Sequence, residues 1–466
     1  MKRVHLIGIC GTAMATAAVM LKQLGFDVGG SDEHVYPPMS EVLAAAGIAP
    51  LEGYRSEHIT EDLDLVVVGN AVSRGNPEVE AVLDRRLRYC SLPELVRDTF
   101  LRGRRPIVVT GTHGKTTTSY MTAWALNESG ADAGYLVAGV ARDLEASGRV
   151  SGGPFVIEGD EYDSAFFDKT AKFLKYLPEI VVVNGIEFDH ADIYRDLDEL
   201  RLAFRRLVCL VPRSGRLLLS ADEPEALALR DGAPCPVETF GFDAGADWRA
   251  ERVSYGPRAT AFDVTFRARP VGSVVLPLLG GFNVRNALGA TAAAVGAGAP
   301  AGAVLEALGR FHGVRRRLEE RGVVRGITVY DDFAHHPTAV RETLQALRQA
   351  ADGRLWAVFE PRSATACRRV FQHDFAAALA VADRVVVAAV FRSNLPAEEK
   401  LSEAALVADL ERRGVSARHV PRVPEIVTYV AGAAQPGDRV VVMSNGGFGG
   451  IHERLLSALA AAPEES

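Results

Sequence analysis

The sequence predicts an α/β protein of three domains, built on largely parallel sheets. Its 466 residues correspond to about three domains at roughly 150 residues each. Short apolar runs alternate with helical runs along most of the chain, and this βαβ order favours parallel sheets. A glycine-rich Gly-Lys-Thr turn in residues 111–117 lies between a strand-like run and a helical run, and such turns hold nucleotide phosphates. We therefore expect a nucleotide site in the second domain.

The first domain, residues 1–103, opens with the buried-strand run "RVHLIGI". A helix with a closing glycine follows in "TAMATAAVMLKQLG", and further strands are expected in "DVGGSD" and "DLVVVGNA". The basic stretch "LRGRRP", residues 101–106, is predicted to be a linker. The start "MKRVHLIGICG" breaks at glycines without a cleavage pattern, so it indicates a strand rather than a signal peptide.

The second domain, residues 104–312, begins with the strand "IVVTG". Strands are also expected in "FVIEGDE", "IVVVNGIEFDH", "GRLLLSADE" and "VGSVVLPLLGGFN", before a small-residue helix in "VRNALGATAAAVGAGA". The third domain, residues 313–466, repeats the alternation, with strands expected in "ITVYDDFAHH", "LWAVFEP", "RVVVAAV" and "RVVVMSNGG".

Composition narrows the class of partner. The chain is 48% hydrophobic and 24% charged, with a formal net charge of −7, which argues against a nucleic-acid partner. No apolar run approaches the roughly 20 residues of a membrane span. The five cysteines form no C-x-x-C pair, which indicates a reducing cytoplasm and neither a zinc site nor a disulfide framework. We expect no membrane partner and no obligate protein partner.

The stretch "GTHGKTT", residues 111–117, departs from the usual phosphate loop G-x-x-x-x-G-K-[ST], because Gly111 stands only three residues before Gly114. A strand, a glycine turn and a helix N-terminus still gather backbone N–H groups around an anion. Lys115 can contact the β- and γ-phosphates, and the Thr116 hydroxyl can ligate Mg²⁺. The alternative is an ordinary glycine-containing turn.

Carboxylates follow two neighbouring strands. "EGDEYD", residues 158–163, ends one strand, and the next delivers Asp189, His190 and Asp192. Strand carboxyl ends face the ligand crevice of an open sheet, and carboxylates complete the oxygen shell of Mg²⁺. A solvated acidic loop and a structural histidine are the alternatives. Two neighbouring strand ends that direct Glu158 and His190 at the same phosphate loop favour a site.

The N-terminal "GICGTAM", residues 8–14, is a weak variant of a dinucleotide turn, since it lacks the third glycine of G-x-G-x-x-G. A plain turn is an equally good interpretation. Asp32, about 20 residues further on, suits a ribose or a base. Two nucleotide sites in one chain would mean that one nucleotide is consumed and the other serves as a handle.

Three later motifs carry polar side chains. Asn283 and Asn286 are at i, i+3 on a helix start and can face one ligand, or they can cap the helix. Residues 315–317 are three arginines that can clamp phosphates, or form a solvated basic hinge. "DDFAHHPT", residues 331–338, follows a strand; it resembles a site, although Asp332 could instead serve only as a cap.

These motifs, together and in this order, resemble the Mur ligase family of bacterial cell-wall synthesis. "GTHGKTT" is similar to that family's ATP loop, which explains its short spacing, and "NGIEFDHAD", "GGFNVRN" and "DDFAHHPT" occupy the expected later positions. The resemblance covers nearly the whole chain. It implies the three-domain Mur ligase architecture: a Rossmann-like N-terminal domain for a UDP-sugar, a phosphate-loop central ATPase domain, and a Rossmann-like C-terminal domain for ATP and a peptide acceptor.

The resemblance also implies a reaction. "GICGTAM", "EYDSAFFDK", "EPRS" and "MSNGGFGGIH" are similar to family members that use a murein tripeptide in peptidoglycan recycling. The lactyl carboxylate of UDP-N-acetylmuramate would attack the γ-phosphorus of ATP. The amino group of L-Ala-γ-D-Glu-meso-diaminopimelate would then attack the resulting acyl phosphate and release phosphate. ATP and Mg²⁺ are the implied cofactors.

The site residues implied by the resemblance fall into four groups. The catalytic residues would be Lys115, Glu158 and His190, with Thr116 and Glu158 on one Mg²⁺ and His190 on a second. ATP would be held by Gly111, Thr112, His113, Gly114, Lys115, Thr116, Thr117, Asn283, Asn286, Arg317 and Asp332. The UDP-sugar would be held by Gly11, Thr12, Ala13, Met14, Ser31, Asp32 and Asn70, and the peptide by Arg362, Ser444 and Asn445. Phe282 stands where the family usually has histidine, which removes a polar side chain from the expected adenine side.

Three alternatives stay open. The chain could add L-alanine to the same UDP-sugar, or extend folate with glutamate, or be a non-catalytic nucleotide switch. A ligase should release phosphate only when both the UDP-sugar and an amine acceptor are present, whereas a switch should be indifferent to both.

Overall fold

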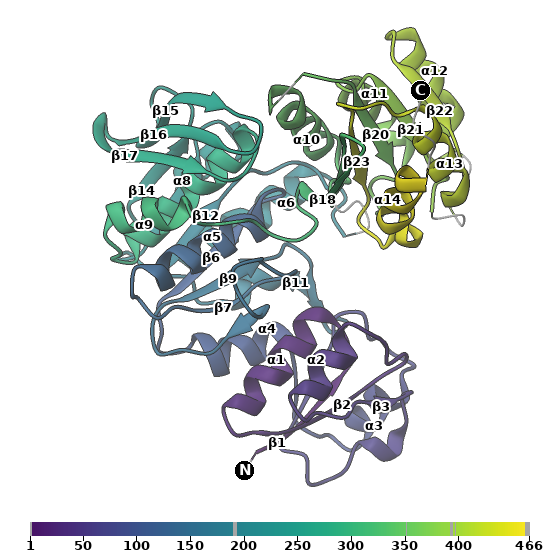
Figure 1. The fold of residues 1–466 in the computed structure, drawn as a ribbon. Helices are drawn as coiled ribbons and strands as arrows, with labels where there is room; N and C mark the ends of the chain where they lie inside the picture. The colour runs from purple at the N-terminus through teal and green to yellow at the C-terminus, as the bar shows by residue number, and fades with distance from the viewer. Residues whose placement is uncertain (1, 190–192, 351, 392–394, 397, 462–466) are drawn as a thin grey trace.

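The computed structural model describes residues 2–189, 193–350, 352–391, 395–396 and 398–461. Three sheets follow one another along the chain, each with helices packed on it (Figure 1). The predictions that concern His190 and Asp192 lie outside the described residues. Within the described residues no helix is long and apolar enough to cross a membrane.

The N-terminal domain is a five-stranded parallel sheet in the order β3-β2-β1-β4-β5. Its elements are β1 (Arg3–Ile7), α1 (Thr12–Gln23), β2 (Asp27–Asp32), α2 (Met39–Ala45), β3 (Leu51–Glu52), β4 (Leu65–Val68), α3 (Pro77–Asp84), β5 (Tyr89–Ser91) and α4 (Leu92–Val96). The strand order reverses between β1 and β4, and a ligand crevice is expected outside the strand ends at such a switch point. The N-terminus of α1 lies at this switch point, in agreement with the turn that the sequence predicts before this helix.

The central domain is a ten-stranded mixed sheet in the order β17-β16-β15-β14-β13-β12-β6-β9-β7-β8. Its strands are β6 (Pro106–Thr110), β7 (Gly134–Leu136), β8 (Gly148–Arg149), β9 (Phe155–Gly159), β12 (Ile180–Val183), β13 (Arg216–Ser220), β14 (Val237–Gly241), β15 (Trp248–Tyr255), β16 (Thr260–Phe266) and β17 (Arg269–Leu276). Its main helices are α5 (Lys115–Glu128), α6 (Leu197–Val208), α8 (Gly281–Gly296) and α9 (Ala301–Leu308). A small hairpin of β10 (Asp163–Ala165) and β11 (Asp168–Ala171) lies outside this sheet. Because β6 pairs in parallel with both β9 and β12, the carboxyl ends of these three strands meet at one place.

The C-terminal domain is a six-stranded sheet in the order β18-β19-β23-β20-β21-β22, parallel except for the β18–β19 pair. Its strands are β18 (Glu319–Val324), β19 (Ile327–Asp332), β20 (Leu355–Phe359), β21 (Arg384–Val387), β22 (Ser416–His419) and β23 (Arg439–Met443). Its helices are α10 (Pro337–Ala350), α11 (Gln372–Leu379), α12 (Glu403–Arg412), α13 (Val423–Ala433) and α14 (Ile451–Ala461). Pro337 is the first residue of α10, where its fixed φ suits a helix start.

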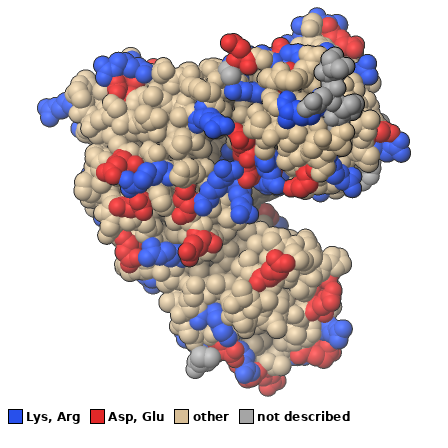
Figure 2. Space-filling model, viewed as in Figure 1, with Lys and Arg blue, Asp and Glu red and all other residues tan. Residues whose placement is uncertain are grey.

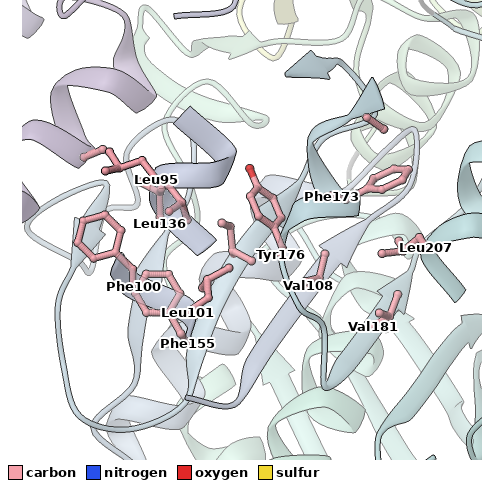
Figure 3. Packing of buried hydrophobic residues seen from close by; sticks show 14 of the residues in the cluster. Leu95, Phe100, Leu101, Val108, Leu136, Phe155, Phe173, Tyr176, Val181 and Leu207 are labelled. Carbon is pink, nitrogen blue, oxygen red and sulfur yellow. The ribbon is translucent and has the colours of Figure 1, made fainter. Parts of the chain in front are cut away.

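One buried apolar cluster runs through both the N-terminal and the central domain. Phe100 and Leu101, which follow α4, pack with Leu136 and Phe155 of the central sheet (Figure 3). The rings of Phe100 and Phe155 are stacked with centroids 6.4 Å apart. The buried apolar clusters of the C-terminal domain consist of its own residues, although Phe188 and Leu279 of the central domain pack against one of them. The first two domains are therefore joined by a continuous core.

The predicted linker is shorter than expected. Leu101 ends a π-helical turn (Arg97–Leu101), and Pro106 already begins β6, so only residues 102–105 connect the two domains. Leu101 and Pro106 are buried and belong to the two domains. The basic side chains between them had suggested that the whole stretch is a linker.

Candidate active site

A cavity of about 540 Å³ lies where the three domains meet. The central domain contributes residues 112–117, the ends of β9 and β12, and the start of α8. The C-terminal domain contributes the three arginines 315–317 and the end of β19, and Thr12 comes from the N-terminal domain. Figure 2 shows a hollow between the N-terminal and C-terminal domains, with basic and acidic side chains gathered at its inner edge. Segments far apart in the sequence thus line one space.

The phosphate loop connects β6 to α5, as predicted, and both of its glycines are required by close packing. Gly111 has φ 122° and Gly114 has φ 75°, a region that favours glycine. A Cβ on Gly111 would lie 2.8 Å from the carbonyl oxygen of Gly185, and one on Gly114 would lie 2.4 Å from Oδ1 of Asn286. The short spacing therefore lets the loop pack directly against the end of β12 and the start of α8.

Lys115 is the first residue of α5, and its side chain is 10% exposed. Its Nζ donates to the Gly111 carbonyl at 2.8 Å and to Glu161 Oε2 at 2.8 Å. Burial alone would lower the pKa of Lys115, but the carboxylates of Glu161 and Asp160 raise it. The lysine therefore carries its charge inside the cavity. Glu161 was not predicted as a site residue, and its only signal was the second glutamate of "EGDEYD".

Glu158 lies at the end of β9, beside Thr116. The Thr116 hydroxyl donates to Glu158 Oε1 at 2.9 Å, and the Ala138 N–H donates to Oε2 at 3.0 Å. Burial and the nearby Asp160 raise the pKa of Glu158 to about 7. The structure thus brings together the hydroxyl and the carboxylate that the sequence assigns to one ion.

Arg316 and Arg317, which follow α9, are held in place and do not belong to a solvated hinge, whereas Arg315 is exposed. The guanidinium carbons of Arg316 and Arg317 lie 5.1 and 4.9 Å from the centroid of the Phe333 ring. Arg317 Nη2 also donates to the Thr116 hydroxyl at 3.2 Å. Asp332 accepts the Ala334 N–H at 2.8 Å, and burial raises its pKa to about 6. Arg317 and Asp332 both line the cavity.

Asn283 and Asn286 are buried in the first turns of α8 and do not cap it, because the N-cap is Gly280. Asn286 lines the cavity, and its Oδ1 accepts from the Thr118 hydroxyl at 3.1 Å. Asn283 does not line the cavity; its Oδ1 accepts from Asn286 Nδ2 at 3.3 Å, so it orients its neighbour. The Phe282 ring lines the cavity next to them.

The predicted UDP-sugar residues divide into exposed and buried ones. Gly11, Thr12 and Ala13 are exposed at the start of α1, and Asn70 is exposed after β4. Asp32 accepts the backbone N–H of Cys10 at 2.8 Å, which shapes the turn before α1. Met14 and Ser31, in contrast, are buried: Met14 is part of the core, and the Ser31 hydroxyl donates to buried Glu78 at 2.5 Å. Sequence position placed both at the crevice, but their side chains point into the domain.

The predicted peptide residues lie together at the ends of β20 and β23, and none of them lines the cavity. The Arg362 guanidinium carbon stacks 3.6 Å from the centroid of Phe391, and Nη1 lies 3.6 Å from Glu360 Oε1. Ser444 donates to Glu360 Oε2 at 2.5 Å. Oδ1 of Asn445 is buried and has no hydrogen-bond partner among the described residues. Phe391 was not predicted, because it follows a different strand; Glu360 stands in the motif "EPRS" two residues before Arg362 but was not assigned a role.

Three family models match the chain in succession. Residues 3–103 match the Mur ligase family catalytic domain, residues 109–294 the Mur ligase middle domain, and residues 316–446 the Mur ligase glutamate ligase domain. The chain is 41% identical to the UDP-N-acetylmuramate–L-alanyl-γ-D-glutamyl-meso-2,6-diaminoheptandioate ligase of Escherichia coli K12, over 99% of both proteins. It is 31% identical to the UDP-N-acetylmuramate–L-alanine ligase of Syntrophus aciditrophicus, over 98% of this chain and 94% of that protein.

Solved structures agree in fold. The crystal structure of a murein peptide ligase from Psychrobacter arcticus 273-4 is 37% identical, with a TM-score of 0.73 over 99% of this chain and 100% of that one. The UDP-N-acetylmuramate-alanine ligase of Thermotoga maritima is 25% identical, with a TM-score of 0.80 over the same shares. With its three-domain architecture and these full-length relatives, the chain belongs to the Mur ligase family and is an ATP-dependent ligase that forms amide bonds.

Proposed function

We propose that the chain joins the lactyl carboxylate of UDP-N-acetylmuramate to the amino group of L-Ala-γ-D-Glu-meso-diaminopimelate, in peptidoglycan recycling. The observation that carries this proposal is the difference in identity between two groups of full-length relatives. Relatives named for the tripeptide are 41% and 42% identical, whereas relatives named as L-alanine ligases are 30–34% identical. Five free cysteines are consistent with a cytoplasmic location.

The reaction needs an acyl phosphate, because a carboxylate at neutral pH is a poor acyl donor. The protein's task is then to position the reactants and to neutralise charge. Lys115, charged and aimed into the cavity, would stabilise the transferring phosphoryl group. Asn286, Arg317 and Asp332 would hold ATP, with Asn283 behind Asn286. The exposed residues at the start of α1 would take the UDP-sugar, with Asp32 shaping their turn.

Mg²⁺ is part of the proposal. The Thr116 hydroxyl and the Glu158 carboxylate supply two oxygen ligands 2.9 Å apart, and oxygen ligands are what Mg²⁺ prefers. When bound, the ion would neutralise phosphate charge. A second ion at His190 remains part of the proposal on the basis of the sequence, and that residue lies outside the described ones.

Residues 1–103, 104–312 and 313–466 are the proposed domain limits.

An acceptor panel tests the proposal. With ATP and UDP-N-acetylmuramate held constant, we expect a far higher kcat/KM for L-Ala-γ-D-Glu-meso-diaminopimelate than for L-alanine. The surface at the ends of β20 and β23 is suited to an extended ligand, and free L-alanine would leave most of it unfilled. Phosphate release is the readout, with reactions lacking the UDP-sugar or the amine as controls. If L-alanine is the better acceptor, the L-alanine ligase replaces the tripeptide ligase as the assignment.

Substituting Arg362 tests the proposed peptide site separately. Arg362→Ala should raise the activation free energy for the peptide by about 1.5–3 kcal/mol if the guanidinium makes a charged hydrogen bond to a peptide carboxylate. This loss corresponds to roughly 10- to 150-fold in kcat/KM. KM for ATP and for the UDP-sugar should change little. Arg412→Ala, on the exposed face of α12, is the matched control, and equal effects of the two variants would contradict the assignment.

A further inference from the structure

Three side chains from separate segments meet on one wall of the cavity. His113 comes from the phosphate loop, Glu187 follows β12, and His336 precedes α10. One possible metal-ligating atom of each lies within 4.8 Å of those of the other two. His113 Nε2 lies 2.7 Å from Glu187 Oε2, and His336 Nδ1 lies 3.4 Å from the same oxygen. The three groups therefore face a common point.

The two separations that involve Glu187 are close to those around a small tetrahedral ion. An ion with ligands at about 2.0–2.2 Å holds neighbouring ligand atoms about 3.3 Å apart. The contact of Glu187 with His336 already has this length, and its contact with His113 is shorter by only about 0.6 Å. A small rotation of the His113 side chain, which is 26% exposed, would open the space that an ion needs.

His336 provides an independent observation, because its imidazole is buried without a short hydrogen bond. The residue is 5% exposed. Its Nδ1 has only a 3.4 Å contact with the Thr338 N–H besides the 3.4 Å contact with Glu187. Its Nε2 has no hydrogen-bond partner among the described residues. Both nitrogens of this buried ring therefore lack a short hydrogen bond to any described residue, and Nδ1 is the one that lies beside the Glu187 carboxylate.

The surroundings hold the three side chains in these positions. The Thr338 hydroxyl donates to Glu187 Oε1 at 2.9 Å, leaving Oε2 toward the two histidines. The His336 ring packs 4.9 Å from the His113 ring and 5.3 Å from the Phe371 ring, measured between centroids. In metal sites, hydrogen bonds of this kind orient the ligating carboxylate and adjust its affinity for the ion.

We propose that His113, Glu187 and His336 form a binding site for one divalent transition-metal ion, represented by Zn²⁺. Two imidazoles and one carboxylate suit Zn²⁺ and leave a fourth position open, whereas Mg²⁺ prefers oxygen ligands. The site is separate from Thr116 and Glu158. The cysteine pattern had led us to expect no zinc site, and this one uses no cysteine. His336 belongs to the C-terminal domain and the other two residues to the central domain, so a bound ion would tie the two domains together.

Metal titration of the nucleotide-free, full-length protein tests the proposal. Zn²⁺ would be titrated in competition with a chromophoric chelator, after removal of bound metal. We expect one tight equivalent in the wild type. Because loss of an outer-shell partner alone typically costs 10- to 100-fold in affinity, the double variant His113→Gln/His336→Gln should bind at least about 100-fold more weakly, and Thr338→Val about 10-fold more weakly.

The control is His312→Gln, an exposed histidine that pairs with Asp143 outside this wall; it should keep the tight equivalent. Circular dichroism would show whether each variant is folded. If the double variant misfolds, Zn²⁺ binding by Thr338→Val becomes the deciding measurement, because this variant only replaces a hydroxyl by a methyl group. The proposal is overturned if the wild type binds Zn²⁺ no more tightly than the folded variants, or if Mg²⁺ in equal amount displaces the ion. Neither result bears on the ligase reaction, which the acceptor panel tests separately.

Discussion

Replacing Lys115 with alanine is expected to lower the rate of acyl phosphate formation by about 10²- to 10³-fold or more, in line with removal of a preorganised charge or donor at a reacting group. Binding of the UDP-sugar should be nearly unchanged, because Lys115 belongs to the central domain. Rapid-quench measurement of the acyl phosphate gives the first quantity, and calorimetric titration with UDP-N-acetylmuramate gives the second.

The contact of Lys115 with Glu161 calls for a second variant. Removing the lysine alone takes one cation away from the carboxylate of Glu161, which is 2% exposed, and breaking a buried pair in this way is destabilising. Lys115→Ala/Glu161→Gln removes both charges and should recover stability but not the rate. Recovery of the rate would mean that the lysine only balances Glu161. Lys22→Ala, on the exposed part of α1, controls for loss of a lysine as such.

The second large effect is expected at Glu158. Glu158→Gln should raise the Mg²⁺ concentration needed for half-maximal activity by at least about 10-fold, because an outer-shell substitution alone commonly costs 10- to 100-fold in metal affinity. The fold should survive, since the residue lies at the edge of the cavity and glutamine keeps its shape. Glu306→Gln, exposed on α9, is the control. A Mg²⁺ requirement equal to that of the wild type would remove Glu158 from the proposed metal site.

The pH dependence gives the same assignment a second test. With a pKa of about 7, Glu158 is largely protonated at pH 6 and largely ionised at pH 8. A metal needs the ionised form, so apparent Mg²⁺ affinity should rise about 10-fold over this interval in the wild type and stay flat in Glu158→Gln. The effect of rising pH on the stability of the fold has the opposite sign. A carboxyl whose pKa is raised by folding destabilises the protein above pH 7, and this cost is relieved as the pH falls through 7.

The sequence predicted the parts of the site that depend on local order. A strand, a short glycine loop and a helix in succession predict that Lys115 and Thr116 open a helix after the loop, and the structure has this order. Glu158 was placed correctly because it ends a strand. The strands that deliver Glu158 and Asp189 were expected to be neighbours; in the sheet, β9 and β12 instead flank β6, the strand that leads into the phosphate loop.

What the sequence missed depends on contacts between distant segments. The pairing of Lys115 with Glu161, and of Arg362 with Phe391, has no periodic or positional signal. Met14 and Ser31 are buried, which the motifs did not indicate. Both lie within motifs at the crevice, but helical and strand periodicity turn their side chains into the core. The antiparallel strands β15 to β17 were expected only as further strands, since short apolar runs do not specify pairing direction.

The continuous core between the first two domains has a mechanical consequence. Any rotation of the N-terminal domain on the central one would separate Phe100 and Leu101 from Leu136 and Phe155 and expose their apolar surface. The N-terminal and central domains should therefore behave as one unit. The start of α1 and the phosphate loop belong to this unit, and Arg362 belongs to the C-terminal domain. Because Arg317 and Asp332 also belong to the C-terminal domain, the cavity is complete only when that domain lies against this unit, whereas the core itself sets the position of the start of α1 relative to the phosphate loop.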